Sequence, residues 1–212
     1  MNADEVRRAV SLARETLSVA TERDWRTVPA AGLEWTCWET LEHVSDALFG
    51  YAAQLGPAKP SVTTYVPFGW RQNRPGGPYL TIYGDHEQGG QAGLLEVFET
   101  CGALLAAMVQ AVPAGTMSFH NYGASDPGGF AAMGVVEVLV HTHDVAGGLG
   151  LPWAPPDDLV AGALDRLFPS APGGFEPWPT LLWCTGRAGL PGRPAPESWK
   201  WDGRPRVSGS SG

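Results

Sequence analysis

Three residues of the sequence have the types and the spacing of a metal site. Glu137 and His141 are four residues apart in the segment GVVEVLVHTHDVAGGLG, so on a helix they share one face and can reach the same ion. His43 lies in a second amphipathic segment, and ligands that project inward from facing helices are one way to build a metal site in a helical bundle. We therefore predict that His43, Glu137 and His141 bind one divalent metal ion.

Glu137 lies in the middle of an apolar segment, where a negative charge needs compensation. The residues around it are Val135, Val136, Val138, Leu139 and Val140. An unpaired buried carboxylate costs on the order of several kcal/mol, and a cation between it and two imidazoles offsets that cost. This ligand set suits Zn²⁺, with Fe²⁺ or Ni²⁺ as alternatives, and it leaves coordination positions for water or substrate. The competing interpretation is a chance pair of Glu and His at this spacing, without a metal.

Two further residues are candidates for catalysis. Asp144 lies one turn after His141, where it could either hydrogen-bond a metal ligand or polarise a bound water. His120 lies in a turn-rich segment, from which it could line a pocket and act as a base. His143 is expected on the side of the helix opposite to the metal ligands, as a hydrogen-bonded core or interface residue.

Several large side chains are candidates for substrate binding, although aromatic residues near the end of a bundle can equally belong to the core. These candidates are Trp35, Trp38, Trp70, Tyr79 and Arg187. Cys37 is placed in the first turn of a helix, where the helix dipole can lower the pKa of a thiol and make it a nucleophile. The alternative for Cys37 is a small buried apolar residue.

Apolar periodicity predicts the helices that position these residues. We expect helices over residues 3–22, 36–55, 91–112 and 130–149, a short helix after Pro152, and one short strand at residues 181–184 (LLWC). Thr36 followed by Glu39 matches a capping box and marks the start of the second helix. Residues 56–89 are rich in Pro and Gly, which predicts either an active-site lid or a long crossover. We expect its own aromatic residues to order it: Tyr65, Phe68, Trp70 and Tyr79.

Composition and charge narrow the classes of partner. The 212 residues carry a net charge of -8 and no run of Lys and Arg, which argues against a nucleic-acid partner. The three cysteines form no CxxC motif, which favours a reducing compartment, with the cytoplasm as the expected location. The first 25 residues carry charges throughout, and no apolar stretch reaches about 18 residues, so neither secretion nor a membrane span is expected.

Two segments, EWTCWETLEHVSDAL and GVVEVLVHTHDVAGGLGLP, resemble the metal-binding N-terminal domain of mycothiol-dependent maleylpyruvate isomerases, in the DinB-like superfamily. The resemblance covers about residues 3–150. It implies a mainly α fold, a DinB-like four-helix bundle with a long connection between its second and third helices, and the metal ligands His43, Glu137 and His141. Residues 1–153 would form this bundle, residues 154–207 a short C-terminal extension packed on it, and residues 208–212 a flexible or appended tail.

The resemblance also implies a cosubstrate. Members of the superfamily use a low-molecular-weight thiol, such as mycothiol, whose sulfur attacks a small electrophilic substrate next to the metal, and they tend to form homodimers. The C-terminal segment LLWCTGRAGLPGRP resembles extensions found in actinobacterial relatives, whereas the isomerases carry a larger second domain. The expected function is thiol transfer to, or isomerisation of, a small molecule. Two other functions stay open: a thiol-independent metal hydrolase or lyase, and a small-molecule binding or resistance protein with a residual metal site.

Overall fold

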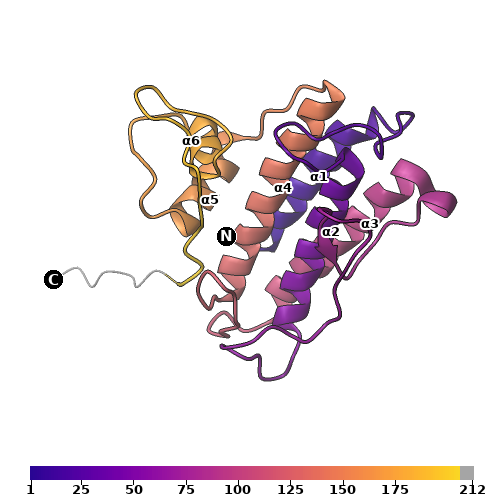
Figure 1. The fold of residues 1–212 in the computed structure, drawn as a ribbon. Coiled ribbons are helices and arrows are strands. Elements are labelled where there is room, and N and C mark those ends of the chain that lie inside the picture. Colours follow the sequence, from indigo (N-terminus) through magenta and orange to yellow (C-terminus); the bar gives the residue numbers. More distant parts are fainter. Residues whose placement is uncertain (206–212) are drawn as a thin grey trace.

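The computed structural model describes residues 1–205 and confirms a mainly α protein (Figure 1). Its described part contains six helices: α1 (Ala3–Ser18), α2 (Cys37–Leu55), α3 (His86–Ala111), α4 (Pro127–Leu149), α5 (Asp157–Leu167) and α6 (Pro177–Cys184). Two short strands, β1 (Arg71–Gln72) and β2 (Tyr79–Leu80), pair antiparallel with Arg71 opposite Leu80. The expected tail at residues 208–212 lies outside the described residues.

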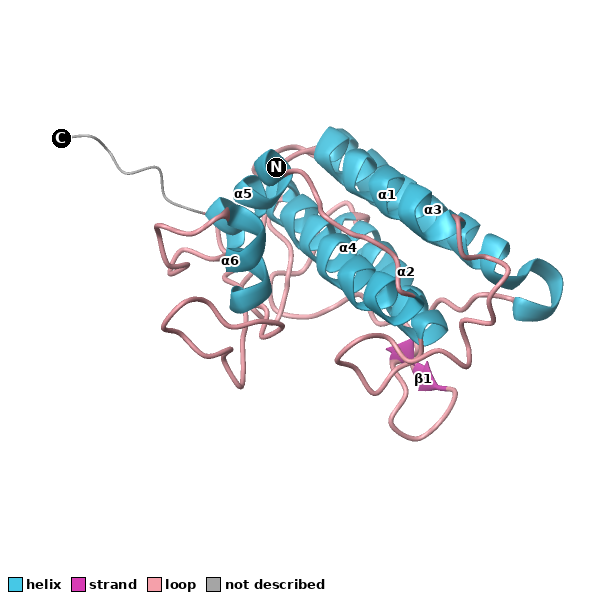
Figure 2. Ribbon diagram, turned by 90° about the horizontal axis from the view of Figure 1, so that it is seen from above, coloured by secondary structure: helices cyan, strands magenta, loops and turns pink. Residues whose placement is uncertain are grey.

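Helices α1 to α4 pack around one hydrophobic core. Both α1 and α2 contact α3 and α4, and Figure 2 shows α1 beside α3 and α2 beside α4. Helix α4 is buried along most of its length because it also carries α5 on its outer side. Its apolar residues face the core on several sides, and they include Phe130, Met133, Val136 and Leu139. The helix that carries two of the predicted ligands is therefore the centre of the structure.

Local signals fix both ends of the two helices that carry the predicted ligands. Helix α2 starts with the predicted capping box, in which the Thr36 side chain accepts from the Glu39 N–H and the Glu39 carboxylate accepts from the Thr36 N–H. Helix α4 is capped by Asp126, which accepts from the Gly129 N–H, and it ends at Gly150 in the left-handed conformation (φ 67°). These caps set where each helix begins and ends, and so which residues face the core.

Helix α3 differs from its prediction at its start. It begins at His86, five residues earlier than expected, and Gly90 interrupts it with a non-helical conformation (φ 54°, ψ -153°). By length and composition α3 could span a membrane (mean hydropathy 1.6), contrary to the absence of such a segment expected from the sequence. This is weak evidence, because the core helix of a helical bundle passes the same test, and α3 packs against α1, α2 and α4.

The connection between α2 and α3 is held mainly by polar side chains of α2. The N–H groups of Thr81 and Ile82 donate to the Asp46 carboxylate at 2.7 and 2.9 Å, and the N–H of Gly84 donates to Glu42 at 2.9 Å. The aromatic residues expected to order this connection remain 38–63% exposed. Their rings make edge contacts, such as that of Phe68 with Phe49, and the Tyr65 hydroxyl also donates to Oδ1 of Asn121 at 3.0 Å. Asp46 and Glu42 of α2 therefore hold the end of this loop, and its aromatic residues add ring contacts and hydrogen bonds.

The C-terminal part confirms one prediction and corrects another. The short helix after Pro152 is α5, but residues 181–184 belong to helix α6 and form no strand. Pro177 lies at the first turn of α6, a position where proline is favoured, and Leu181 and Cys184 are buried at helical spacing. Helix α6 packs on α5, which packs on α4, and the N–H of Gly203 donates to the Tyr122 carbonyl at 2.9 Å. The segment after α4 therefore folds back onto the helical core.

The close contact of α3 with α1 depends on Gly102. A methyl group added there would lie 2.6 Å from Cγ2 of Val10, whereas a methyl group at Gly93, in the same helix, would meet no atom within 4 Å. We expect Gly93→Ala to stabilise the protein by about 0.5–1 kcal/mol through helix propensity. Gly102→Ala should be less stable than Gly93→Ala by about 1–3 kcal/mol because of overpacking. Urea unfolding of both variants measures the difference, and equal stabilities would contradict this packing.

Candidate metal centre

The structure brings the three predicted ligands together between α2 and α4. Nε2 of His43 lies 3.6 Å from Oε2 of Glu137, and Nε2 of His141 lies 3.3 Å from the same oxygen. All three ligand atoms lie within 4.8 Å of one another. Glu137 and His141 are buried, and His43 is partly exposed. This group could hold a metal ion, and it is accessible from the side of His43.

The spacing of the ligand atoms suits a divalent cation of the first transition row. Bonds from such an ion to imidazole nitrogen or carboxylate oxygen are about 2.0–2.2 Å long, so ligand atoms around a tetrahedral ion lie about 3.4 Å apart. The separations of 3.3 and 3.6 Å agree with this value. The group could therefore hold an ion between α2 and α4.

Two glycines of α4 allow it to lie close enough to α2. A methyl group at Gly134, one turn before Glu137, would lie 2.5 Å from Cδ2 of Leu105 and 3.1 Å from Cδ2 of Leu48. A methyl group at Gly148 would lie 3.0 Å from the sulfur of Cys37 and still closer to a backbone oxygen. Larger residues at these positions would push α4 away from its neighbours. The glycines thus set the separation across which the three ligands meet.

Asp144 and Arg187 orient His141 from its Nδ1 side, opposite to the Nε2 atom that faces Glu137. Oδ2 of Asp144 lies 2.9 Å from Nδ1 of His141, on the ring edge opposite to Glu137. Arg187 donates to this carboxylate through Nε (2.9 Å to Oδ1) and Nη2 (2.7 Å to Oδ2), and its Nη1 donates to the Thr185 carbonyl at 3.0 Å. A carboxylate at Nδ1 fixes the tautomer that directs the Nε2 lone pair toward an ion. Asp144 therefore lies where a residue that orients a metal ligand is expected.

The pKa shifts of this cluster follow from burial and from pairing. Burial raises the pKa of Glu137, but hydrogen bonds and charge from His141 and His43 lower it more, so its pKa lies well below the ordinary range. Burial likewise raises the pKa of Asp144, and the hydrogen bonds with His141 and Arg187 reverse the sign. Both carboxylates are therefore charged at neutral pH, and each needs its positive or hydrogen-bonding neighbours.

Tyr51 is a contact of the cluster that the sequence analysis did not single out. Its hydroxyl donates to Oε1 of Glu137 at 3.2 Å, which leaves Oε2 for the two histidines. Burial and the adjacent negative charge of Glu137 raise the pKa of Tyr51 well above its ordinary value, so the hydroxyl keeps its proton. The sequence does contain a signal for this contact: Tyr51 lies eight residues after His43, about two helical turns further along α2, and so near the same face of the helix.

Two cavities meet at the ligand group. One, of about 720 Å³, is lined by His141, Asp144 and Arg187, together with Trp35 and Trp199. The other, of about 330 Å³, is lined mainly by aromatic residues and by Glu137. We refer to them as the Arg187 cavity and the aromatic cavity. Of the described residues, only His43 lines both. The cluster therefore lies at the boundary between two spaces of different chemistry.

The residues predicted to bind substrate are divided between these spaces. Trp35 and Arg187 line the Arg187 cavity, and Trp70, Tyr79 and His120 line the aromatic cavity. The indole of Trp35 lies 5.0 Å from the imidazole of His43, between ring centroids. Trp38 lines neither cavity: it is buried, with its edge against the ring of His86.

The expectation for His143 needs correction, and for Cys37 one of the two alternatives is supported. His143 does not point away from the ligand side into the core: it is partly exposed, lines the Arg187 cavity and lies edge-on to Trp178 at 5.6 Å. Residues 185–187, which follow α6, also line this cavity, and Trp178 of α6 packs against the ring of His143. Cys37 is fully buried, and desolvation raises the pKa of its thiol to about 11, which supports the apolar interpretation rather than a nucleophile.

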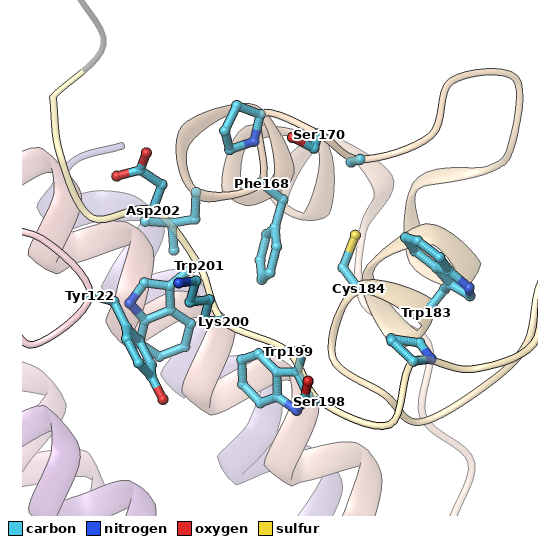
Figure 3. A pocket seen from close by; sticks show the side chains of 14 residues that line it. Tyr122, Phe168, Ser170, Trp183, Cys184, Ser198, Trp199, Lys200, Trp201 and Asp202 are labelled. Atoms are coloured by element: carbon cyan, nitrogen blue, oxygen red, sulfur yellow. The ribbon is translucent and has the colours of Figure 1, made fainter.

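A third cavity, of about 680 Å³, lies between α5, α6 and the C-terminal segment (Figure 3). Figure 3 shows Phe168, Trp199 and Cys184 around its centre, with Tyr122 and Trp201 at one side. Trp199 also lines the Arg187 cavity, so its indole separates the two spaces. None of the three predicted ligands lines this third cavity, which places it outside the candidate metal centre.

No protein-family model, curated protein or solved structure matches this chain.

Substitution of Glu137 tests the metal site directly. Gln has the size of Glu but lacks the charge, so we expect Glu137→Gln to lose the bound ion, while the wild-type protein retains about one ion per chain. Elemental analysis after dialysis, on protein purified without a polyhistidine tag, measures this content. His86→Ala is the matched control, because His86 lies outside the cluster and this variant should keep its ion. Equal metal content in all three proteins would contradict the assignment.

Metal affinity should rise with pH. Burial lowers the pKa of His141, but hydrogen bonds with Asp144 and Glu137 raise it more, so in the metal-free protein its pKa lies above 6.5. An ion must displace this proton, so affinity should increase by up to about tenfold per pH unit as the pH rises through the raised pKa, and then level off. Competition titrations with Zn²⁺ between about pH 6 and 8 measure this dependence.

Asp144→Asn is the control for that titration. It removes the hydrogen bond that raises the pKa of His141 most, so the rise in affinity should move to lower pH. It should also weaken binding by about 10–100-fold, as loss of a residue that orients a metal ligand does. An affinity that is independent of pH in both proteins would show that His141 does not bind the ion.

Proposed function

We propose that this chain is a metal-dependent enzyme that uses a low-molecular-weight thiol, such as mycothiol, to transfer sulfur to, or to isomerise, a small electrophile. We further propose that α1 to α4 form a DinB-like four-helix bundle related to the N-terminal domain of mycothiol-dependent maleylpyruvate isomerases. The observation that carries the proposal is the three-ligand group at the boundary of two cavities. A two-substrate reaction needs two molecules to meet at one reactive centre.

The donor set supports an ion with open coordination positions. Two imidazoles and one carboxylate leave room for one or more exogenous ligands, as in catalytic rather than structural sites. When bound, a Zn²⁺, Fe²⁺ or Ni²⁺ ion would supply a Lewis acid that lowers the pKa of a thiol or of a water molecule. Asp144 holds the tautomer of His141, and Tyr51 keeps Oε1 of Glu137 occupied, so the chain presents its ligand atoms in one arrangement.

The proposed reaction balances without an oxidant or a reductant. The thiol loses its proton, its sulfur forms a bond to an electrophilic carbon, and the electron pair of the attacked double bond moves to an acceptor oxygen on the substrate. Return of a proton to carbon completes an addition, and loss of the thiol after bond rotation completes an isomerisation. The Arg187 cavity, whose lining includes the charged residues Glu34, Arg187 and Glu197, offers a place for the thiol, since a low-molecular-weight thiol such as mycothiol carries many hydrogen-bonding groups.

Asp144 is a positioning residue in this proposal rather than a base. Both of its oxygens accept hydrogen bonds from Arg187, one also contacts His141, and the residue is 1% exposed. This weakens a thiol-independent hydrolase in which Asp144 would activate water. His120 remains the candidate for proton transfer or hydrogen bonding to substrate, because it lines the aromatic cavity together with Glu137.

Thiol-dependent turnover tests the proposal. We expect metal-loaded protein to consume mycothiol together with a small aryl enone and to release the thiol adduct, detected by mass spectrometry. Glu137→Gln should lower this rate by about 100-fold or more, since a bound ion contributes several kcal/mol to such reactions. Cys37→Ala, which removes a buried thiol of the chain, should leave the rate unchanged.

Two outcomes would contradict the proposal and separate the other functions. Equal turnover with and without thiol would indicate a metal hydrolase or lyase. Tight binding of the enone that survives chelation, without any turnover, would indicate a binding or resistance protein.

A further inference from the structure

The aromatic cavity has the size and lining of a site for one flat ring. Its volume of about 330 Å³ lies at the lower end of the range for small-molecule sites. Its walls carry six aromatic residues besides the tyrosine at the cluster: Phe49, Tyr65, Phe68, Trp70, Tyr79 and Phe130. Trp70 and Tyr79 are 61% and 63% exposed, so their rings are not packed in the hydrophobic core and can contact a ligand. Stacking and edge contacts with such rings favour flat apolar molecules.

The carboxylates that line this cavity already accept hydrogen bonds from other residues of the protein. Asp46 accepts from the N–H groups of Thr81 and Ile82, and Glu137 is held by Tyr51 and the two histidines of the cluster. Among the described residues, none that lines the cavity is Arg or Lys. Apart from the candidate metal ligands, Asp46 is the one acidic residue among the described residues that line this cavity, so a carboxylate held away from the cluster would meet an acidic group and no guanidinium or ammonium group. There the lining favours a neutral group over a carboxylate.

His120 can offer the cavity one hydrogen-bond donor of defined position. The backbone N–H of Tyr122 donates to its Nδ1 at 3.1 Å, so Nδ1 carries a lone pair and the proton of the neutral ring is on Nε2. Burial lowers the pKa of His120 to about 4, in keeping with a neutral ring. The rings of Tyr51 and Phe130 pack edge-on or tilted against it at 5.9 and 6.5 Å, which holds its orientation.

The same donor lies next to the metal ligands. The ring of Tyr51 is 5.9 Å from that of His120, and the hydroxyl of Tyr51 donates to Glu137. Since His43 and Glu137 also line the cavity, a ring held there would lie beside the cluster. We infer that the aromatic cavity binds a neutral, flat, ring-containing electrophile, whose carbonyl or similar acceptor oxygen is hydrogen-bonded by Nε2–H of His120.

This inference names the substrate class for the proposed function and rests on that function for the claim that the bound molecule reacts. The acceptor oxygen is the atom to which the electron pair of the attacked double bond moves when the sulfur to carbon bond forms. A neutral N–H donor at that oxygen stabilises the developing negative charge. The thiol would then approach from the Arg187 cavity, across His43.

Binding of a neutral aryl enone tests the site without requiring turnover. We expect isothermal titration calorimetry, in the absence of thiol, to show binding of 4-phenyl-3-buten-2-one that is at least about tenfold tighter than binding of its analogue with a ring carboxylate. Trp70→Ala should weaken enone binding by about 5- to 10-fold, through loss of an aromatic contact worth about 1 kcal/mol. Trp199→Ala is the matched control, because it removes a partly exposed indole from the other two cavities, and it should leave enone binding unchanged.

Variants of His120 test the hydrogen bond. His120→Phe keeps a ring but removes the donor, and it should weaken enone binding by about 3- to 10-fold. His120→Gln places an amide N–H near the position of Nε2 and should restore part of the loss. Thermal unfolding shows whether either variant is folded, and Trp70→Ala tests the same site from an exposed position if they are not.

The outcomes separate the inference from the proposed function. Equal binding of the neutral and the carboxylate probes, or unchanged binding in both Trp70→Ala and His120→Phe, would overturn the inference even if thiol-dependent turnover is found. Weakened binding in those two variants, without turnover in the presence of any thiol, would support the site and contradict the proposed function.

Discussion

The structure depends on one buried negative charge. Glu137 lies in the middle of α4, the most buried helix, and a carboxylate in such surroundings is stable only with positive or hydrogen-bonding partners. His43, His141 and Tyr51 provide them, each from one of the two ligand-bearing helices. Because removal of one partner leaves the others with an uncompensated charge, the cluster acts as a unit. The contact between α2 and α4 therefore serves both the fold and the candidate site.

The pairing of negative with basic groups continues beyond the three candidate ligands. His141 lies between Glu137 and Asp144, and Asp144 lies between His141 and Arg187, so negative groups alternate with basic ones along the row. Such a row places a proton or a cation between each pair of carboxylates. An ion bound by Glu137 would replace a proton and leave the outer part of the row unchanged. Asp144 and Arg187 would then keep the same contacts with and without an ion.

Arg187 connects this row to the segment after α4. The sequence analysis assigned Arg187 to substrate binding, and the structure shows that both Nε and Nη2 donate to Asp144, while the residue also lines a cavity. Its backbone neighbour Thr185 accepts a further hydrogen bond from the guanidinium. A planar donor held at both ends orients a carboxylate more strictly than a lysine would. The C-terminal extension therefore contributes to the geometry of the cluster as well as covering α4 through α5.

The residues that sequence reasoning placed correctly are those with a local signal. The spacing of Glu137 and His141 on one helical face, the apolar surroundings of Glu137 and the capping box at Thr36 all follow from residues within one or two turns. The misplaced features depend on contacts between distant segments. Residues 181–184 are short and apolar, a pattern that suits a strand or a buried helix equally, and packing on α5 decides between them. The place of His143 likewise depends on distant residues, because Trp178 of α6 packs on its ring and residues 185–187 line the same cavity.

The two segments that lie outside the four long helices each complete one side of the candidate site. The connection between α2 and α3, held by Asp46 and Glu42, supplies Tyr65, Trp70 and Tyr79 to the aromatic cavity. The C-terminal extension supplies the residues opposite to Trp35 in the other cavity, among them Arg187 and Trp199. The helices alone would leave His43 and its partners open to water. The long connection and the extension therefore have one common role: each encloses a different side of the same cluster, so that a separate cavity lies on each side of His43.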